Sequence, residues 1–177
     1  MARSLPQRMI GAAMLDVSVY EEVEIDQSAT SQAAIVVAIV AVCGAIGASG
    51  DGSRGIIAAV ISAFVTWGLW SVVTWFVGTK FFGGTATVGE LLRTLGFAMS
   101  PGVLYILGFI PILGGLIGFV VWIWMLVTGV IAIRQALDVD TTKAVLTAVI
   151  SLAVVIAFQL FLAAILLGAS AIGRVFS

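Results

Sequence analysis

Residues 94–133 read TLGFAMSPGVLYILGFIPILGGLIGFVVWIWMLVTGVIAI and contain no Asp, Glu, Lys or Arg. A transmembrane helix needs roughly 20 apolar residues, so this stretch is about twice as long as one span and must cross a bilayer twice. Pro111 stands near its middle beside Gly114 and Gly115, where a helix would break and restart. The stretch therefore predicts two spans joined by a turn at residues 111–115 on the outer side of the membrane.

The rest of the chain has the same membrane character. Of its 177 residues, 62% are hydrophobic and only 10% are charged, with a mean hydropathy of +1.24, which lies outside the usual range of soluble domains. Three more uncharged stretches, residues 27–50, 55–79 and 144–173, are each long enough for one span. We therefore predict an all-α, polytopic membrane protein, a five-helix transmembrane bundle with short cytosolic amphipathic helices. The predicted domains are a cytosolic amphipathic and acidic segment, residues 1–30, and a transmembrane domain, residues 31–177, with spans at 31–49, 55–78, 95–110, 113–133 and 143–168.

The distribution of Lys and Arg predicts the orientation. Five spans place the two ends of the chain on opposite sides, and basic residues of short loops concentrate on the cytosolic side. Six of the eight basic residues fall on the side of the amino terminus, and two fall on the other side. The six are Arg3, Arg8, Lys80, Arg93, Arg134 and Lys143, and the two are Arg54 and Arg174. We expect a cytosolic amino terminus, an outer carboxy terminus and residence in the cell (inner) membrane, with no secretory signal peptide because the first 26 residues lack an apolar core.

A capped amphipathic helix is predicted before the third span. Thr87 and Glu90 have the spacing of a capping box, and apolar residues recur at i, i+3, i+4 and i+7 from Val88. We expect this helix to lie along the cytosolic boundary of the membrane, with Glu90 and Arg93 reaching water. Pro101 then removes a backbone hydrogen bond and kinks the chain, either only to redirect it or as a hinge with a functional use.

The segment before the first span predicts two more short helices. Ser4 is a possible N-cap with Pro6 in the first turn, and the helix that follows has an apolar face suited to the membrane interface. Ser18 and Glu21 have capping-box spacing in the next segment. Glu21, Glu22, Glu24 and Asp26 form an acidic patch that is either a solvated face or a docking surface for a cytosolic partner. The candidate partner-docking residues are Glu21, Glu22, Glu24, Glu90 and Arg93.

Conventional catalytic chemistry is missing from the sequence. The chain has no histidine, which removes imidazole bases, proton relays and metal ligands. No charged residue lies deep in a predicted span, as ion-coupled transporters usually require. Asp138 and Asp140 offer too few oxygen ligands for a closed cation site, and Asp140 or Thr141 is better suited to cap the fifth span. We therefore predict no enzyme, no cofactor, no metal and no catalytic residue.

A few polar and small residues remain as candidate contacts within the membrane. Gln159 is the most polar side chain deep in a span, and it serves either as an interhelical hydrogen-bonding group or as a ligand for a solute. Gly114 and Gly118, four residues apart, permit a close helix contact within or between chains.

Several segments in the same order resemble the Yip (Ypt-interacting protein) family, specifically its bacterial branch of YIP-domain membrane proteins. They are RMIGAAMLDVSVYEEVEIDQSAT at 8–30, FGGTATVGELLRTLGFAMSP at 82–101, WIWMLVTGVIAIRQAL at 122–137 and DTTKAV at 140–145. The resemblance implies five spans and a cytosolic amino terminus, and it supplies no catalytic residues. The DLYGP-type motif of eukaryotic members is absent, so binding to Rab-type GTPases is not carried over.

Two functions remain open at this point. The first is a non-enzymatic membrane-organising or interaction protein, acting as a scaffold or accessory subunit through its cytosolic helices. The alternative is a passive channel or permease for a small or lipidic solute, with the backbone breaks at Pro101 and Pro111 lining a cavity. The expected partners are the lipid bilayer and other membrane or cytosolic proteins, with a homo-oligomer or a larger complex possible and no nucleic acid, because no basic patch is present.

Overall fold

The computed structural model describes residues 3–48 and 52–175, and the side chains among them except those of 52–54 and 166–175. Over this part of the chain the structure is all-helical. Its elements are α1 (Leu5–Ala13), α2 (Val17–Ile25), α3 (Ala29–Gly47), α4 (Gly52–Phe81), α5 (Val88–Ala98), the 3-10 helix η1 (Ser100–Phe109), α6 (Leu113–Leu137) and α7 (Thr141–Val175). Residue 49, where the first predicted span ends, and the side chains of Arg54 and Arg174 lie outside the described part.

Within the described residues, five helical segments are long and apolar enough to cross a membrane, as predicted. They are Ala29–Gly47, Gly55–Phe81, Val88–Phe109, Leu113–Leu137 and Thr141–Ile165. The protein is therefore an integral membrane protein. The third of these segments, Val88–Phe109, comprises α5 and η1, whereas the predicted third span is residues 95–110 and follows the amphipathic helix.

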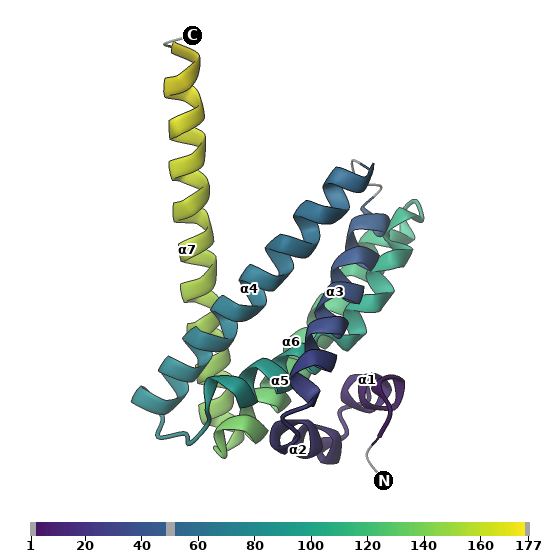
Figure 1. Ribbon diagram of the computed structural model, residues 1–177, viewed down its shortest axis with the longest axis vertical. Helices are drawn as coiled ribbons and strands as arrows, with labels where there is room; N and C mark the ends of the chain where they lie inside the picture. Colours follow the sequence, from purple (N-terminus) through teal and green to yellow (C-terminus); the bar gives the residue numbers. More distant parts are fainter. Residues whose placement is uncertain (1–2, 49–51, 176–177) are drawn as a thin grey trace.

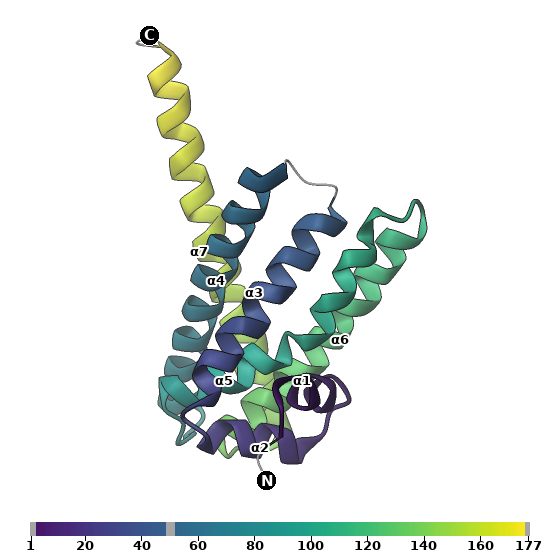
Figure 2. The same cartoon turned by 45° about the vertical axis from the view of Figure 1, so that its right-hand side comes forward.

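The arrangement of the helices places the two termini at opposite ends of the bundle (Figure 1). α1 and α2 lie at one end, together with the α4–α5 and α6–α7 connections. α3, η1 and α6 run side by side in both views, whereas the carboxy-terminal half of α7 extends away from the other helices (Figure 2). The interior of the bundle is therefore built mainly on α3, α5, η1 and α6, with α4 and α7 on one flank.

The position expected for α5 is wrong in one respect. Arg93 does not reach water, since only 7% of it is exposed, and Leu91, Leu95 and Phe97 are completely buried. The helix packs tightly because Gly96 has no side chain: a Cβ there would lie 2.7 Å from the Cβ of Ala33 on α3. The apolar residues that recur from Val88 predicted one buried face of α5. They did not indicate the close packing at Gly96, which helps to bury the rest of the helix.

A turn does join η1 to α6, at the end of the bundle far from α2 (Figure 1). Ile112 in this turn is 96% exposed and has a φ of 67°. Of the two glycines of the GxxxG pair, Gly114 makes a close contact within the chain, since a Cβ there would lie 2.2 Å from the carbonyl oxygen of Gly108. A Cβ at Gly118 would meet nothing within 4 Å in the described part of the chain. The glycines that bring backbones together here are instead Gly47, Gly108 and Gly114, from α3, η1 and α6.

The predicted helix caps are mostly confirmed. The backbone N–H of Ser4 donates to Oε1 of Gln7 at 2.9 Å, and Thr87 with Glu90 forms a capping box at the start of α5. Asp140 caps α7 by accepting from the N–H of Lys143 at 3.0 Å. The cap predicted at Ser18 is wrong. α2 begins two residues earlier than that cap implies, at Val17, and its N-cap is Asp16, whose carboxylate accepts from the N–H of Ser18.

Candidate interaction site at the amino-terminal helices

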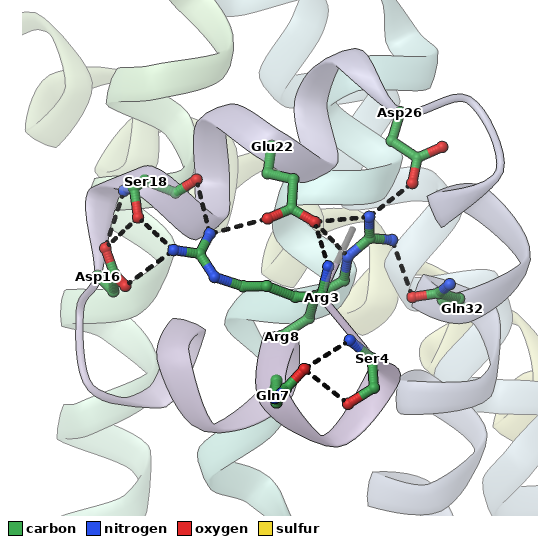
Figure 3. Close-up of polar contacts among 9 residues, drawn as sticks. All are labelled: Arg3, Ser4, Gln7, Arg8, Asp16, Ser18, Glu22, Asp26 and Gln32. Carbon is green, nitrogen blue, oxygen red and sulfur yellow. Dashed lines mark hydrogen bonds and ion pairs between the residues drawn. The ribbon is translucent and has the colours of Figure 1, made fainter. Parts of the chain in front are cut away.

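Arg8 is the centre of the polar contacts that hold the amino-terminal helices together. It projects from α1 and only 1% of it is exposed. Its Nη2 lies 2.8 Å from Oε1 of Glu22 on α2 and 2.6 Å from Oδ2 of Asp26, and its Nη1 donates to Oε1 of Gln32 on α3 at 3.0 Å (Figure 3). A buried guanidinium needs such partners, because an unpaired charge away from water is costly. One side chain therefore connects three helices.

Arg3 lies on the outer side of the same cluster, which we call the arginine cluster and define as Arg3, Arg8, Glu22, Asp26 and Gln32. Its Nη1 lies 2.8 Å from Oε2 of Glu22, and its Nη2 donates to Oγ of Ser18 at 2.9 Å (Figure 3). Glu22 is thus held between two guanidinium groups. Burial opposes its ionisation, but the hydrogen bonds from Arg8 and Arg3 prevail and lower the pKa of Glu22. Glu22 is consequently a structural anion and not part of a free acidic patch.

Two further side chains tether these helices to the bundle through their carboxy-terminal ends. The last carbonyl groups of a helix lack partners within it. Nε1 of Trp124 on α6 donates to the carbonyl oxygen of Ala13 at 2.7 Å, at the end of α1. Nε of Arg93 on α5 donates to the carbonyl oxygens of Val23 and Glu24, at 2.9 and 3.0 Å, at the end of α2. Arg93 is therefore a helix cap supplied from another element, which explains its burial.

Four of the other acidic groups lie near one another where α2, α5 and the end of α6 meet. We define the acidic surface as Glu21, Glu24, Glu90 and Asp138. Burial, together with the negative charges of Asp138, Glu90 and Glu21, raises the pKa of Glu24 to about 7, against the opposing charge of Arg93. The Arg93 donors are directed to backbone carbonyls, so the carboxylates of this surface are not paired by it.

The sequence-predicted docking residues divide into two groups in the structure. Glu21, Glu24 and Glu90 contribute to the acidic surface, whereas Glu22 belongs to the arginine cluster and Arg93 is buried. Glu21 is exposed, and its Oε1 accepts from Nε2 of Gln135 on α6 at 3.2 Å.

Asp138 was not among the docking candidates. It ends α6 with a φ of 53°, and its Oδ2 accepts from Oγ1 of Thr85 at 3.2 Å. Its membership of the surface follows from the tertiary arrangement, since more than a hundred residues separate it from α2. No local motif in the sequence could have indicated this.

Comparison with known families agrees with this architecture. A family model described as the Yip1 domain matches residues 19–168, which is most of the chain. The chain belongs to the Yip1 family. No curated protein and no solved structure matches it.

The Yip1 domain match runs from the third residue of α2 into α7 and leaves out α1, which precedes it. Arg8 therefore connects a helix outside the matched residues to α2 and α3 within them. Within the Yip1 domain, Pro101 is the second residue of η1, where the chain changes from α-helix to 3-10 helix. Gln159 on α7 donates through Nε2 to Oγ1 of Thr66 on α4 at 3.0 Å. Among the described residues of this Yip1-family protein, no group of three or more His, Cys, Asp or Glu side chains is arranged to hold a metal ion.

Proposed function

We propose that this Yip1-family protein is a non-enzymatic membrane-organising subunit, of the scaffold or accessory kind, that recruits a cytosolic partner through its acidic surface. The amino-terminal end of the bundle faces the cytosol of a cell membrane in this proposal, in keeping with the excess of Lys and Arg on that side. The partner segment is basic, because a surface of carboxylates attracts Lys and Arg and repels acidic partners.

The observation that carries the proposal is the environment of Glu24. Like charges brought close together are unfavourable, and here three acidic neighbours from α2, α5 and α6 face one half-buried carboxylate. Asp26 and Glu22, only two residues away on either side, are neutralised by Arg8 within the chain. A basic side chain from a partner would relieve the repulsion at the acidic surface, but would gain little at the arginine cluster.

Removal of two charges tests this function. Glu21→Gln with Asp138→Asn keeps both hydrogen-bond acceptors, and Asn tolerates the positive φ at 138. We expect proteins that co-purify in stoichiometric amounts with the wild type from native membranes to be reduced several-fold with this variant. The matched control is Asp16→Asn, which removes an exposed charge at the other end of α2 and keeps its capping oxygen. An unchanged set of partners for the double variant would contradict docking at the acidic surface.

The alternative of a passive channel or permease predicts a different result. Purified protein in sealed liposomes would then accelerate the flux of a small solute, and the double variant would not affect it. Flux above that of protein-free liposomes would favour the alternative, whereas loss of partners without any flux favours the interaction role.

A further inference from the structure

The two faces of α1 have the opposite polarity to those of a surface helix on a soluble protein. Arg8 and Ala12 are buried on its inner face. Its outer face carries Ile10, which is 60% exposed, and the C-cap residue Met14, which is 73% exposed. The members of each pair are four residues apart, and the two pairs are separated by about 200° around the helix. A charge inside and apolar side chains outside are the arrangement expected of a helix in contact with lipid.

A hydrogen bond fixes the depth of α1 relative to the bundle. Nε1 of Trp124 donates to the carbonyl oxygen of Ala13, the last residue of α1. Trp124 is near the middle of α6 (Leu113–Leu137), about 17 Å from one end and about 20 Å from the other at about 1.5 Å per residue. A hydrocarbon core is about 30 Å thick. The end of α1 therefore lies beside the interior of a membrane span, and not beyond its cytosolic end.

The surroundings of α1 agree with this depth. In both views α2 lies at the end of the bundle, and α1 lies above it, nearer to the opposite end (Figure 1, Figure 2). α1 packs against α5 and η1, which together form the third span. Trp124 also lines an apolar groove between η1 and α6, together with the exposed side chains of Leu104, Leu116 and Val120. The outer face of α1 thus adjoins the apolar surface of two membrane-spanning segments.

The carboxy-terminal end of α1 has the backbone pairing that lipid requires. The last four carbonyl groups of a helix have no partner within it, and in lipid each must be satisfied by the protein. All four in α1 accept from protein donors at 2.7–3.0 Å: Ile10 from the N–H of Met14, Gly11 from the N–H of Asp16, Ala12 from Oη of Tyr20 and Ala13 from Nε1 of Trp124. The exposed polar side chains Ser4 and Gln7 are at the other end of the helix. The deeper end of α1 therefore needs no water.

We propose that α1 is embedded in the bilayer, with Ile10 and Met14 among the acyl chains of the leaflet on the amino-terminal side, so that lipid covers its outer face. α2 stays on the water side of α1, where its Ser18 and Glu21 are exposed. The arginine cluster lies between the two helices and keeps the charge of Arg8 away from lipid. The proposal does not depend on the acidic surface or on the partner that this surface recruits.

Quenching by lipid-borne nitroxides tests the proposal. Ile10→Cys and Met14→Cys, each in the full chain with Cys43→Ala, would be labelled with bimane in nanodiscs of phosphatidylcholine that carries a doxyl group on its acyl chain. The lipid-facing reference is Phe119→Cys on α6, where the native side chain is as exposed as that of Ile10. We expect quenching at the two α1 sites to reach at least about half of that at the reference.

The matched control in water is Gln27→Cys, in the α2–α3 connection, where the native side chain is also exposed. Its bimane label should be quenched by the doxyl lipid at least about three-fold less than the labels on α1. Aqueous iodide should reverse this order and quench the label at Gln27 most strongly. The sites of all these labels are exposed, so the labels leave the packing of the bundle in place.

The wild-type protein provides a second arm that needs no substitution. Phosphatidylcholine with a diazirine on its acyl chain forms covalent adducts with the side chains that it meets on illumination, and fragmentation of peptides by mass spectrometry locates them. We expect adducts on residues 10–15 as well as on α6, and at least about three-fold fewer on α2 than on α1.

Three results would overturn the proposal. If the labels at Ile10 and Met14 behave like the label at Gln27, α1 lies in water. If neither the doxyl lipid nor iodide reaches them, protein covers the outer face of α1, as in an assembly of several copies of the chain. Adducts that are confined to α6 and the other spans in the wild-type protein would likewise exclude α1 from the acyl region.

Discussion

At the scale of single residues, Glu24 links the acidic surface to pH. Its pKa is about 7 in the folded protein against an ordinary value of 4.5. The folded state therefore binds a proton more readily than the unfolded state, so the stabilising contribution is complete below about pH 4.5 and is lost as the pH rises through 7. Glu22 and Asp26 behave in the opposite sense, because their pKa values are lowered in the folded protein. Their stabilising contribution is present above their ordinary pKa values and is lost as the pH falls through the lowered values.

We accordingly expect the free energy of unfolding to increase by roughly 1–3 kcal/mol between pH 8 and pH 5. Glu24→Gln should remove most of this dependence and be more stable than the wild type at pH 8. Denaturant titrations in detergent micelles at both pH values would measure it. A wild type that loses stability over this interval would show that Glu24 is not the group that dominates it.

Gly114 provides a second residue-scale prediction. A Cβ at this position would lie 2.2 Å from a backbone oxygen of Gly108, which cannot move as a side chain would. Gly114→Ala should therefore lower the free energy of unfolding by roughly 1–3 kcal/mol. Gly118→Ala is the matched control on the same helix, and it should be neutral or stabilising by up to about 1 kcal/mol, since helix interiors favour Ala over Gly. Equal effects of the two substitutions would refute the close contact.

At the scale of elements, Arg8 and Arg3 provide a matched pair. Both contact Glu22, but Arg8 is buried and connects α1, α2 and α3, whereas the Arg3 side chain is 36% exposed. Arg8→Ala should destabilise the amino-terminal helices by roughly 3–5 kcal/mol, because it leaves carboxylates without their buried partner. Arg3→Ala should cost about 0–1 kcal/mol, as exposed ion pairs do.

Hydrogen exchange would locate these two effects. We expect amides of α1 and α2 to lose protection in Arg8→Ala, while the core of α6 remains protected. Similar exchange in the two variants would mean that Arg3 and Arg8 stabilise the arginine cluster equally and that Arg8 is not its centre.

At the scale of the whole molecule, the testable property is topology. Gln27 in the α2–α3 connection and Ile112 in the η1–α6 connection are both exposed. These two connections lie at opposite ends of the bundle (Figure 1). In a protein with Cys43 replaced by Ala, a membrane-impermeant thiol reagent added to intact cells should label Ile112→Cys but not Gln27→Cys. Labelling of both sites from outside, or of Gln27→Cys alone, would contradict a cytosolic amino terminus.

Membrane residence, five spans and most helix caps were predictable because each depends on residues close together in the sequence. An uncharged stretch of a given length has few alternatives to a helix in lipid, since every backbone polar group must find a partner there. A capping box such as that of Thr87 and Glu90 is likewise complete within four residues. The family resemblance followed from the same local segments, and the Yip1 domain match confirmed the Yip family.

Burial and partnership were decided by the tertiary structure alone. The sequence offered Arg93 as a water-facing charge, but its partners are carbonyl groups about seventy residues away, and only the packing of α2 on α5 brings them within reach. For the same reason, Asp138 lies at the acidic surface, and Gly108 lies against both Gly47 and Gly114. The sequence by itself therefore determined which segments enter the membrane, because transfer into lipid depends on composition. Which side chains face one another depends on contacts between distant segments, and no local pattern encodes them.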